Sequence, residues 1–150
     1  MVSYRSEIRV RYAETDQMGV VHHATYPIWF EAARSDLFRA MSLPYSEFEA
    51  NGVIILVTEM TCRFLKPAHY DELIEVEATP CLLTPVRLTV EYQVTRSGDG
   101  ALLATGSTRH AFANPQGRPI NLKKTPFWRK LAEALPDIIA TTQKKAADER

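Results

Sequence analysis

Cysteine, net charge and long apolar runs are scarce or missing in this sequence. Its 150 residues contain two cysteines, Cys62 and Cys81, too few for a disulfide framework and not spaced as a zinc site. The longest apolar run, Val53 to Val57, is far shorter than the roughly 20 residues that cross a bilayer. The first residues also lack the apolar core of a signal peptide. These absences predict a soluble, cytoplasmic protein with no stable membrane insertion.

The charges balance, with 18 Lys and Arg against 18 Asp and Glu. A net charge of zero removes the usual electrostatic argument for nucleic acid or an anionic membrane as a partner. A hydrophobic content of 45% in 150 residues is enough for one core. We therefore expect one domain over residues 1–135, followed by a C-terminal extension over 136–150 whose polar end, Lys144 to Arg150, is frayed.

The first half of the sequence predicts a strand and then a long helix. Ile8, Val10 and Tyr12 alternate with arginines, which is the period of a strand with one buried face. From His23 or Ala24 to Met41 the apolar residues follow the helical period, and Pro27 is tolerated in the first turn. Ser46 and Glu49 offer a capping box for a short second helix.

The second half predicts four strands, over residues 53–64, 72–79, 86–95 and 101–113, with turns at 97–100 and 114–117. Thr125 is expected to cap a last helix that has Pro126 at its first position. This order is an α+β arrangement in which one antiparallel sheet covers one helix. A single subunit would leave a sheet edge and a face uncovered, so we expect at least a homodimer.

The stretch from Tyr12 to Tyr26 places a carboxylate, a glycine hinge and two imidazoles just before the long helix. The start of a helix has amides without intrahelical partners and a partial positive charge, so it can hold an oxyanion. Asp16 beside such a site could act as nucleophile or base. This combination suits acyl transfer from an activated carbonyl.

Each of these residues also has an ordinary structural explanation. Asp16 could be a turn residue bonded to its own backbone. His22 and His23 could bind a metal with Asp16, His69 or His110, but no ligand spacing is present and we expect no metal. Glu31 and Arg34, three residues apart on the helix, are expected to form an ordinary ion pair.

Eight positions of this stretch carry a resemblance to a known family: Tyr12, Thr15, Asp16, Gly19, Val20, Val21, His23 and Tyr26. From Arg5 to about Leu131 the chain resembles the hotdog-fold acyl-CoA thioesterases of the 4-hydroxybenzoyl-CoA thioesterase family, especially the YbgC-type branch. The resemblance implies a five- or six-stranded antiparallel sheet wrapped around a long central helix. It also implies a homodimer or homotetramer with active sites between subunits.

The resemblance further implies roles for individual residues. Asp16 matches the catalytic carboxylate, and the backbone amide of His23 matches the group that holds the thioester oxygen. Substrate binding is expected of the motif residues Gly19, Val20, Val21, His22 and Tyr26. Arg63 and Lys66 are added as candidate cations for coenzyme A because of their positions near strand ends and turns. His22 stands where a tyrosine is usual in the branch. The substrate is an acyl-CoA and no separate cofactor is expected, since coenzyme A is part of the substrate.

Other points stay open from the sequence. Arg118, Lys123 and Lys124 are further candidates for holding the phosphates of coenzyme A. Trp29, Phe30, Met60 and Phe64 could shape an acyl pocket or be plain core. A hotdog hydratase or dehydratase is one rival, but its Gly-Asp-x-Asn-Pro-x-His pattern is missing here. A non-catalytic acyl-CoA-binding protein of the same fold is the other.

Overall fold

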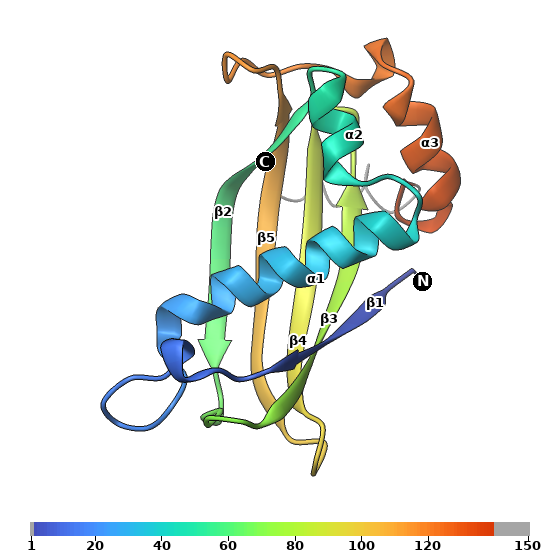
Figure 1. The fold of residues 1–150 in the computed structure, drawn as a ribbon. Coiled ribbons are helices and arrows are strands. Elements are labelled where there is room, and N and C mark those ends of the chain that lie inside the picture. Colours follow the sequence, from blue (N-terminus) through green and yellow to red (C-terminus); the bar gives the residue numbers. More distant parts are fainter. Residues whose placement is uncertain (1, 140–150) are drawn as a thin grey trace.

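The computed structural model describes residues 2–139, and in it five strands form one antiparallel sheet in the order β1-β3-β4-β5-β2. The strands are β1 (Tyr4–Arg9), β2 (Ile54–Phe64), β3 (Leu73–Leu83), β4 (Arg87–Arg96) and β5 (Leu102–Ala113). The long helix α1 (Tyr26–Ala40) crosses one face of this sheet (Figure 1). The predicted α+β arrangement with a five- or six-stranded sheet is confirmed.

Alternation along the strands separates a core face from an outer face. On β4, Leu88, Val90, Tyr92 and Val94 are buried while the residues between them are half-buried or exposed, as the sequence predicted. The Phe30 ring of α1 stacks on the Tyr92 ring with centroids 4.3 Å apart. Gly106 of β5 permits this approach, because a Cβ atom there would lie 2.5 Å from the Phe30 ring.

The first strand starts and ends earlier than the alternation suggested. It ends at Arg9, and Tyr12 begins a short 3-10 turn, η1 (Tyr12–Glu14), so the prediction of strand through Tyr12 is wrong. The Tyr12 ring is 73% exposed and stacks on the Tyr70 ring at 3.7 Å between centroids. Two-residue alternation alone could not distinguish the strand from the turn that follows it.

The helices largely follow the predicted ranges. The 3-10 turn η2 (His23–Thr25) leads directly into α1, which ends at Ala40. The short helix α2 (Tyr45–Ala50) starts after Pro44, so the capping box predicted at Ser46 is wrong. Near the end lie η3 (Leu122–Lys124) and α3 (Phe127–Ala134). Pro126 is the N-cap of α3 and not its first helical residue, so the prediction of Thr125 as the cap is wrong, although the Thr125 hydroxyl accepts a bond from the Phe127 amide at 3.3 Å. The predicted polar tail from Lys144 lies outside the described residues.

The predicted ion pair between Glu31 and Arg34 is wrong. Arg34 turns inward, is 6% exposed, and donates to the hydroxyls of Tyr45 at 2.8 Å and Tyr92 at 3.0 Å. Burial disfavours the charge, but the two phenol oxygens offset it and hold the Arg34 pKa above its ordinary value. Helical spacing alone did not show that this face of α1 packs against the sheet.

Within residues 2–139, none of the helices is long and apolar enough to span a membrane. The outer face of the sheet is polar and carries ion pairs such as Arg5 with Glu77 at 2.9 Å. Large apolar side chains are exposed instead along β2, the strand at one edge of the sheet.

Candidate active site

The segment between η1 and η2 is a closed loop that carries Asp16. Asp16 donates its amide to the Val20 carbonyl at 2.9 Å, and Gly19 donates its amide to the Asp16 carbonyl at 3.0 Å. An isolated bridge joins Thr15 to Val21. Gly19 has a φ of +79°, a left-handed conformation that glycine adopts without strain. The glycine predicted as a hinge therefore makes the tight turn that closes the loop.

A second loop, residues 65–72 after β2, holds the first one in place. Val21 donates its amide to the Ala68 carbonyl at 2.8 Å, and an isolated bridge joins Val20 to His69. Arg96 of β4 in turn donates to the Pro67 carbonyl at 3.0 Å. Figure 1 shows both loops beside the start of α1 and the end of β2. Backbone pairing thus fixes the distance between two segments about 50 residues apart.

A pocket of about 310 Å³ lies between these loops and the start of α1. It brings together predicted site residues from all three segments, namely Asp16, Val20, Val21, His23, Tyr26 and Lys66. Met18, Phe64, Leu65 and Pro67 complete the lining. The mostly apolar walls around one carboxylate and one lysine are typical of a site for an organic substrate.

The amides at the helix start are not all occupied. His22 accepts the Ala24 amide on its Nδ1 atom at 3.0 Å, and its carbonyl accepts the Thr25 amide at 2.9 Å. Among the described residues no acceptor is found for the His23 amide. This leaves one N–H donor available at a position that lines the pocket.

The Asp16 carboxylate also has a local role. Its Oδ1 atom accepts the Met18 amide at 2.9 Å, which is the turn contact that the sequence allowed as an ordinary explanation. One oxygen therefore fixes the side chain relative to its own loop. No hydrogen bond occupies Oδ2 in the part of the chain that the structure describes.

Tyr26 forms a rigid wall of the pocket. The residue is 2% exposed and meets the rings of Trp29 and Phe64 edge-on, with centroids 4.9 and 5.0 Å away. Burial, followed by the nearby Cys62 and Glu72, raises the Tyr26 pKa to about 12. The phenol therefore keeps its proton at physiological pH.

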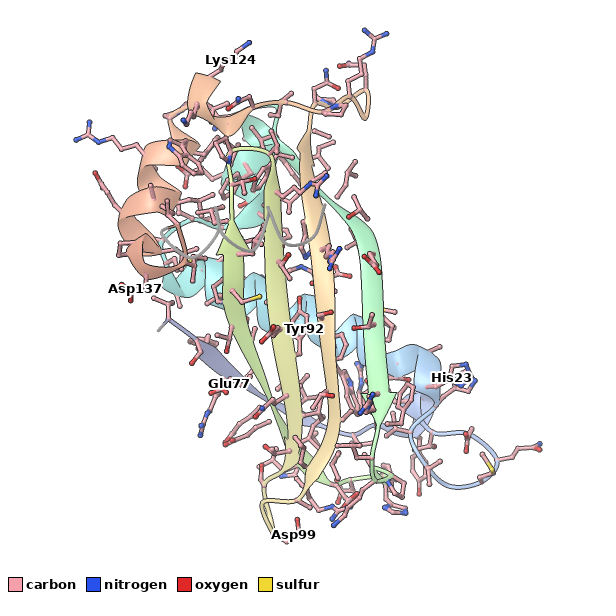
Figure 2. The ribbon with its side chains drawn as sticks, turned by 180° about the vertical axis from the view of Figure 1, so that it is seen from behind. His23, Glu77, Tyr92, Asp99, Lys124 and Asp137 are labelled. Atoms are coloured by element: carbon pink, nitrogen blue, oxygen red, sulfur yellow. The ribbon has the colours of Figure 1, made fainter. Side chains whose placement is uncertain are left out.

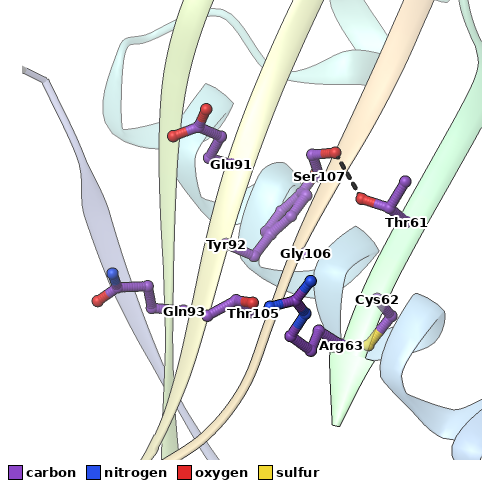
Figure 3. Close-up of a pocket in the computed structure, with 9 residues that line it drawn as sticks. All are labelled: Thr61, Cys62, Arg63, Glu91, Tyr92, Gln93, Thr105, Gly106 and Ser107. Carbon is purple, nitrogen blue, oxygen red and sulfur yellow. Dashed lines mark hydrogen bonds between the residues drawn. The ribbon is translucent and has the colours of Figure 1, made fainter.

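Three predicted site residues do not line this pocket. Gly19 shapes the loop, and His22 caps η2. Arg63 lies on the outer face of the sheet, in a hollow of about 530 Å³ where Thr61 and Ser107 share a hydrogen bond of 2.8 Å (Figure 3). Side chains alternate between the faces of a strand, so Arg63 points away from the face that its neighbour Phe64 shares with the core.

The other basic candidates lie elsewhere in the chain. Figure 2 shows Lys124 near the end of the molecule opposite to His23. Arg118 and Lys123 belong to the same segment of sequence. Within one chain, Lys66 is the candidate cation that lines the pocket with Asp16.

Sequence reasoning missed Met18, Leu65 and Pro67 as pocket residues. The run Leu65-Lys66-Pro67 directly follows an apolar strand, which was the available signal. Of the aromatic candidates for an acyl pocket, Phe64 lines the site, whereas Trp29 and Phe30 are core residues with 2% and 0% exposure. Met60 is 42% exposed on the edge strand and lines none of this pocket.

Asp16 and His23 line the same pocket, but the histidines of the described residues build no metal-type cluster with carboxylates. His110 belongs to the core network with Thr108, at 2.7 Å, and is 1% exposed. His22 and His23 stack on each other with ring centroids 4.2 Å apart. Over residues 2–139 no group of three potential metal ligands is found.

Comparison with known proteins gives consistent matches. Residues 10–138 match the thioesterase-like superfamily. The chain is 46% identical over 68 residues to the putative acyl-CoA thioesterase YneP of Bacillus subtilis, which is 45% of this chain and 49% of YneP. It is 34% identical over 74 residues to the acyl-CoA thioester hydrolase YbgC of Escherichia coli O157:H7, which is 49% of this chain and 55% of YbgC. The chain thus spans about half the length of these curated relatives.

A solved structure extends the likeness to the whole chain. The DHNA-CoA thioesterase from Staphylococcus aureus superimposes with a TM-score of 0.83 and 30% identity. The alignment covers 100% of this chain and 97% of that protein. The likeness in fold therefore extends over the whole chain.

Proposed function

This chain belongs to the thioesterase-like superfamily and has the hotdog fold, and from this premise we propose that it hydrolyses acyl-CoA thioesters. The relatives at family level are enzymes that act on thioesters. The proposal rests on the pocket that Asp16 and His23 both line, and on the His23 amide, for which no acceptor is found within residues 2–139. A carboxylate and an oxyanion donor beside one pocket are what acyl transfer requires.

The Asp16 carboxylate and the His23 amide have different roles in the proposed reaction. The free oxygen of Asp16 acts on the thioester carbonyl or on a water molecule. The His23 amide donates to the carbonyl oxygen as negative charge builds on it, with the partial positive charge of the helix start in support. Removing one such donor typically costs about 3–4 kcal/mol of transition-state stabilisation.

The reaction consumes one water and yields a free carboxylic acid and coenzyme A. In one route Asp16 attacks the carbonyl, the thiolate of coenzyme A leaves, and water opens the resulting mixed anhydride. In the other route Asp16 takes a proton from water, which attacks the carbonyl while the thiolate leaves. A thioester is already activated, so neither route needs a metal or an organic cofactor.

The walls of the pocket suit the two ends of such a substrate. Phe64, Leu65 and Val20 present apolar surface to an acyl group or to the pantetheine arm. Lys66 supplies a positive charge for a phosphate of coenzyme A. The distant Arg118, Lys123 and Lys124 reach the nucleotide only if a second subunit brings them there.

A second copy of the chain is part of the proposal, because one edge of the sheet is unfinished. By the strand register, Val57, Met60 and Phe64 share the core-facing side with His110, Thr108 and Ala104. They nevertheless remain 51%, 42% and 50% exposed. An exposed apolar edge strand favours pairing with an identical strand, which would place part of the partner beside the pocket next to Phe64.

The test is release of thiol from a panel of short, long and aryl acyl-CoAs by the purified chain. Asp16→Asn is expected to lower kcat/KM on the order of 10²- to 10⁴-fold, the range for losing a positioned acid or base. Asp71→Asn is the matched control. Asp71 is an exposed aspartate in the neighbouring loop with a φ of +67°, which asparagine also tolerates.

Two results would contradict the proposal. One is the absence of thiol release from every substrate, and the other is unchanged turnover in Asp16→Asn. A change in enoyl absorbance without thiol release would instead favour a hydratase of this fold. Binding of acyl-CoA without any turnover would favour a non-catalytic protein.

A further inference from the structure

Glu14 is a buried charge in the loop segment that the proposed chemistry does not use. It is 6% exposed. Its Oε1 atom accepts the Arg11 amide at 2.9 Å, while Oε2 accepts the Trp29 indole N–H at 2.8 Å and the Arg11 guanidinium at 3.2 Å. Burial alone would raise the Glu14 pKa, but these hydrogen bonds outweigh it and the pKa lies below its usual value. The side chain is therefore a carboxylate with both oxygens occupied.

The backbone of the same residue holds the other end of the loop. The Glu14 carbonyl accepts the His22 amide at 2.8 Å and lies 3.4 Å from the Thr25 hydroxyl, which donates to it. Through its side chain Glu14 reaches Trp29, which lies beyond His23 in the first turn of α1. One residue thus ties the start of the loop, its end and the helix together.

We propose that Glu14 is a positioning residue that sets the Asp16 loop in register with the helix start carrying the His23 amide. This inference rests on the proposed function. Asp16 is two residues from Glu14. Backbone hydrogen bonds close the loop that carries Asp16, so this loop moves together with Glu14. A shift of about 1 Å between reacting groups costs on the order of 10²-fold in rate.

The contacts distinguish this role from that of an ordinary surface ion pair. Trp29 is 2% exposed and belongs to the helix face that packs on the sheet, so it is a fixed reference point. Arg11 alone would give little positional control, because its side chain is 72% exposed. Beside the backbone contacts of Glu14 with His22 and Thr25, the bond from Trp29 is therefore the contact through which the Glu14 side chain transmits the position of α1 to the loop.

The test compares kcat and KM for Glu14→Gln and Trp29→Phe. The glutamine presents an N–H₂ group where Arg11 donates, and the phenylalanine removes the indole donor while keeping an aromatic ring. Glu14→Gln is expected to lower kcat about 10- to 100-fold with KM changed less than about threefold. Trp29→Phe is expected to lower kcat by less, and the double variant by less than the product of the two effects, because both remove the same contact.

Glu77→Gln is the matched control, since it also removes an ion pair, with Arg5 at 2.9 Å, on the outer face of β3. Its kcat is expected to equal that of the wild type. A purely structural role would lower the melting temperature in Glu14→Gln without separating kcat from KM. If Glu14→Gln does not fold, unchanged kcat in a folded Trp29→Phe overturns the inference.

The outcomes separate the two proposals. A wild-type chain that releases no thiol refutes the proposed function and this inference with it. Wild-type turnover that is lost in Asp16→Asn but retained in Glu14→Gln refutes only the inference. If the losses of kcat in Glu14→Gln and Trp29→Phe multiply in the double variant, the inference about Glu14 is also overturned, because the two side chains then act through independent contacts.

Discussion

At the scale of single residues, the most unusual group is a histidine held neutral inside the core. His110 is 1% exposed and bonds to Thr108 through Nε2. Burial, assisted by the positive charge of Arg34, lowers the His110 pKa to about 3 from an ordinary 6.5. Between these two pKa values, His110 is therefore protonated in the unfolded chain but not in the folded chain.

This predicts a specific loss of stability in acid. Above pH 6.5 neither state is protonated at His110, and between pH 6.5 and about 3 only the unfolded state is, so stability falls as the pH falls. The wild type should lose roughly 1–2 kcal/mol more than His110→Asn between pH 6.5 and 5, since one proton is worth about 1.4 kcal/mol per pH unit and the unfolded histidine is half protonated at pH 6.5. Urea unfolding at the two pH values and fixed protein concentration measures this. Equal losses in the two proteins would show that His110 is not responsible.

At the scale of elements, the start of α1 combines a 3-10 turn with a side-chain cap. His22 accepts the Ala24 amide and thereby satisfies one of the free donors of η2. The neighbouring His23 amide stays available. A histidine at position 22 can supply this cap because an imidazole nitrogen can accept a backbone amide.

Removal of the cap should affect both stability and turnover. His22→Ala is expected to lower the free energy of unfolding by about 1 kcal/mol, a typical cost for losing a cap. It should also lower kcat, because the turn that presents the His23 amide loses its support. His22→Asn restores an acceptor and should recover most of both losses. Thermal unfolding and thiol release check this, and equal behaviour of the two variants would refute the role of the cap.

For two elements, the sequence pattern was sufficient to predict the observed structure. The clean alternation of β4 predicted its buried and exposed sides, and the apolar period predicted α1 to within about two residues. The first strand was misplaced because the alternating residues up to Tyr12 continue beyond the last ladder pair, at Arg9. The start of α2 was misplaced because Pro44, and not Ser46, precedes its first turn.

At the scale of the whole molecule, the proposed assembly depends on the edge strand β2. It pairs with β5 along one side, and the apolar side chains that face the core side near its end are exposed.

Met60→Lys should place a charge at the edge where a second copy would pair, and should therefore shift the chain toward monomer. If the site lies between subunits, this variant should also lose turnover. Gln93→Lys, on the polar outer face of β4, should keep the wild-type mass.

Light scattering after gel filtration measures the mass of each variant. A wild-type chain that is already monomeric, or a Met60→Lys variant that keeps the wild-type mass, would contradict assembly through β2. Turnover in a proven monomer would show that one chain holds the complete site.

The sequence by itself determined the fold class, the loop with Asp16 and the helix start beside it. These features depend on local spacing, namely alternation in strands, the helical period and a motif of 15 residues. The prediction of Tyr26, Val20 and Val21 beside Asp16 came from the motif, and that of Lys66 came from its position near a strand end; all four line the pocket. Their catalytic and binding roles remain predictions.

Only the tertiary structure decided which way the remaining side chains face. Arg63 lies on the outer face, Arg34 turns into the core, and Glu14 meets a tryptophan 15 residues further along the chain. Each of these outcomes depends on which segments pack together. Because packing is a long-range property, the residues nearby in sequence carried no signal for it.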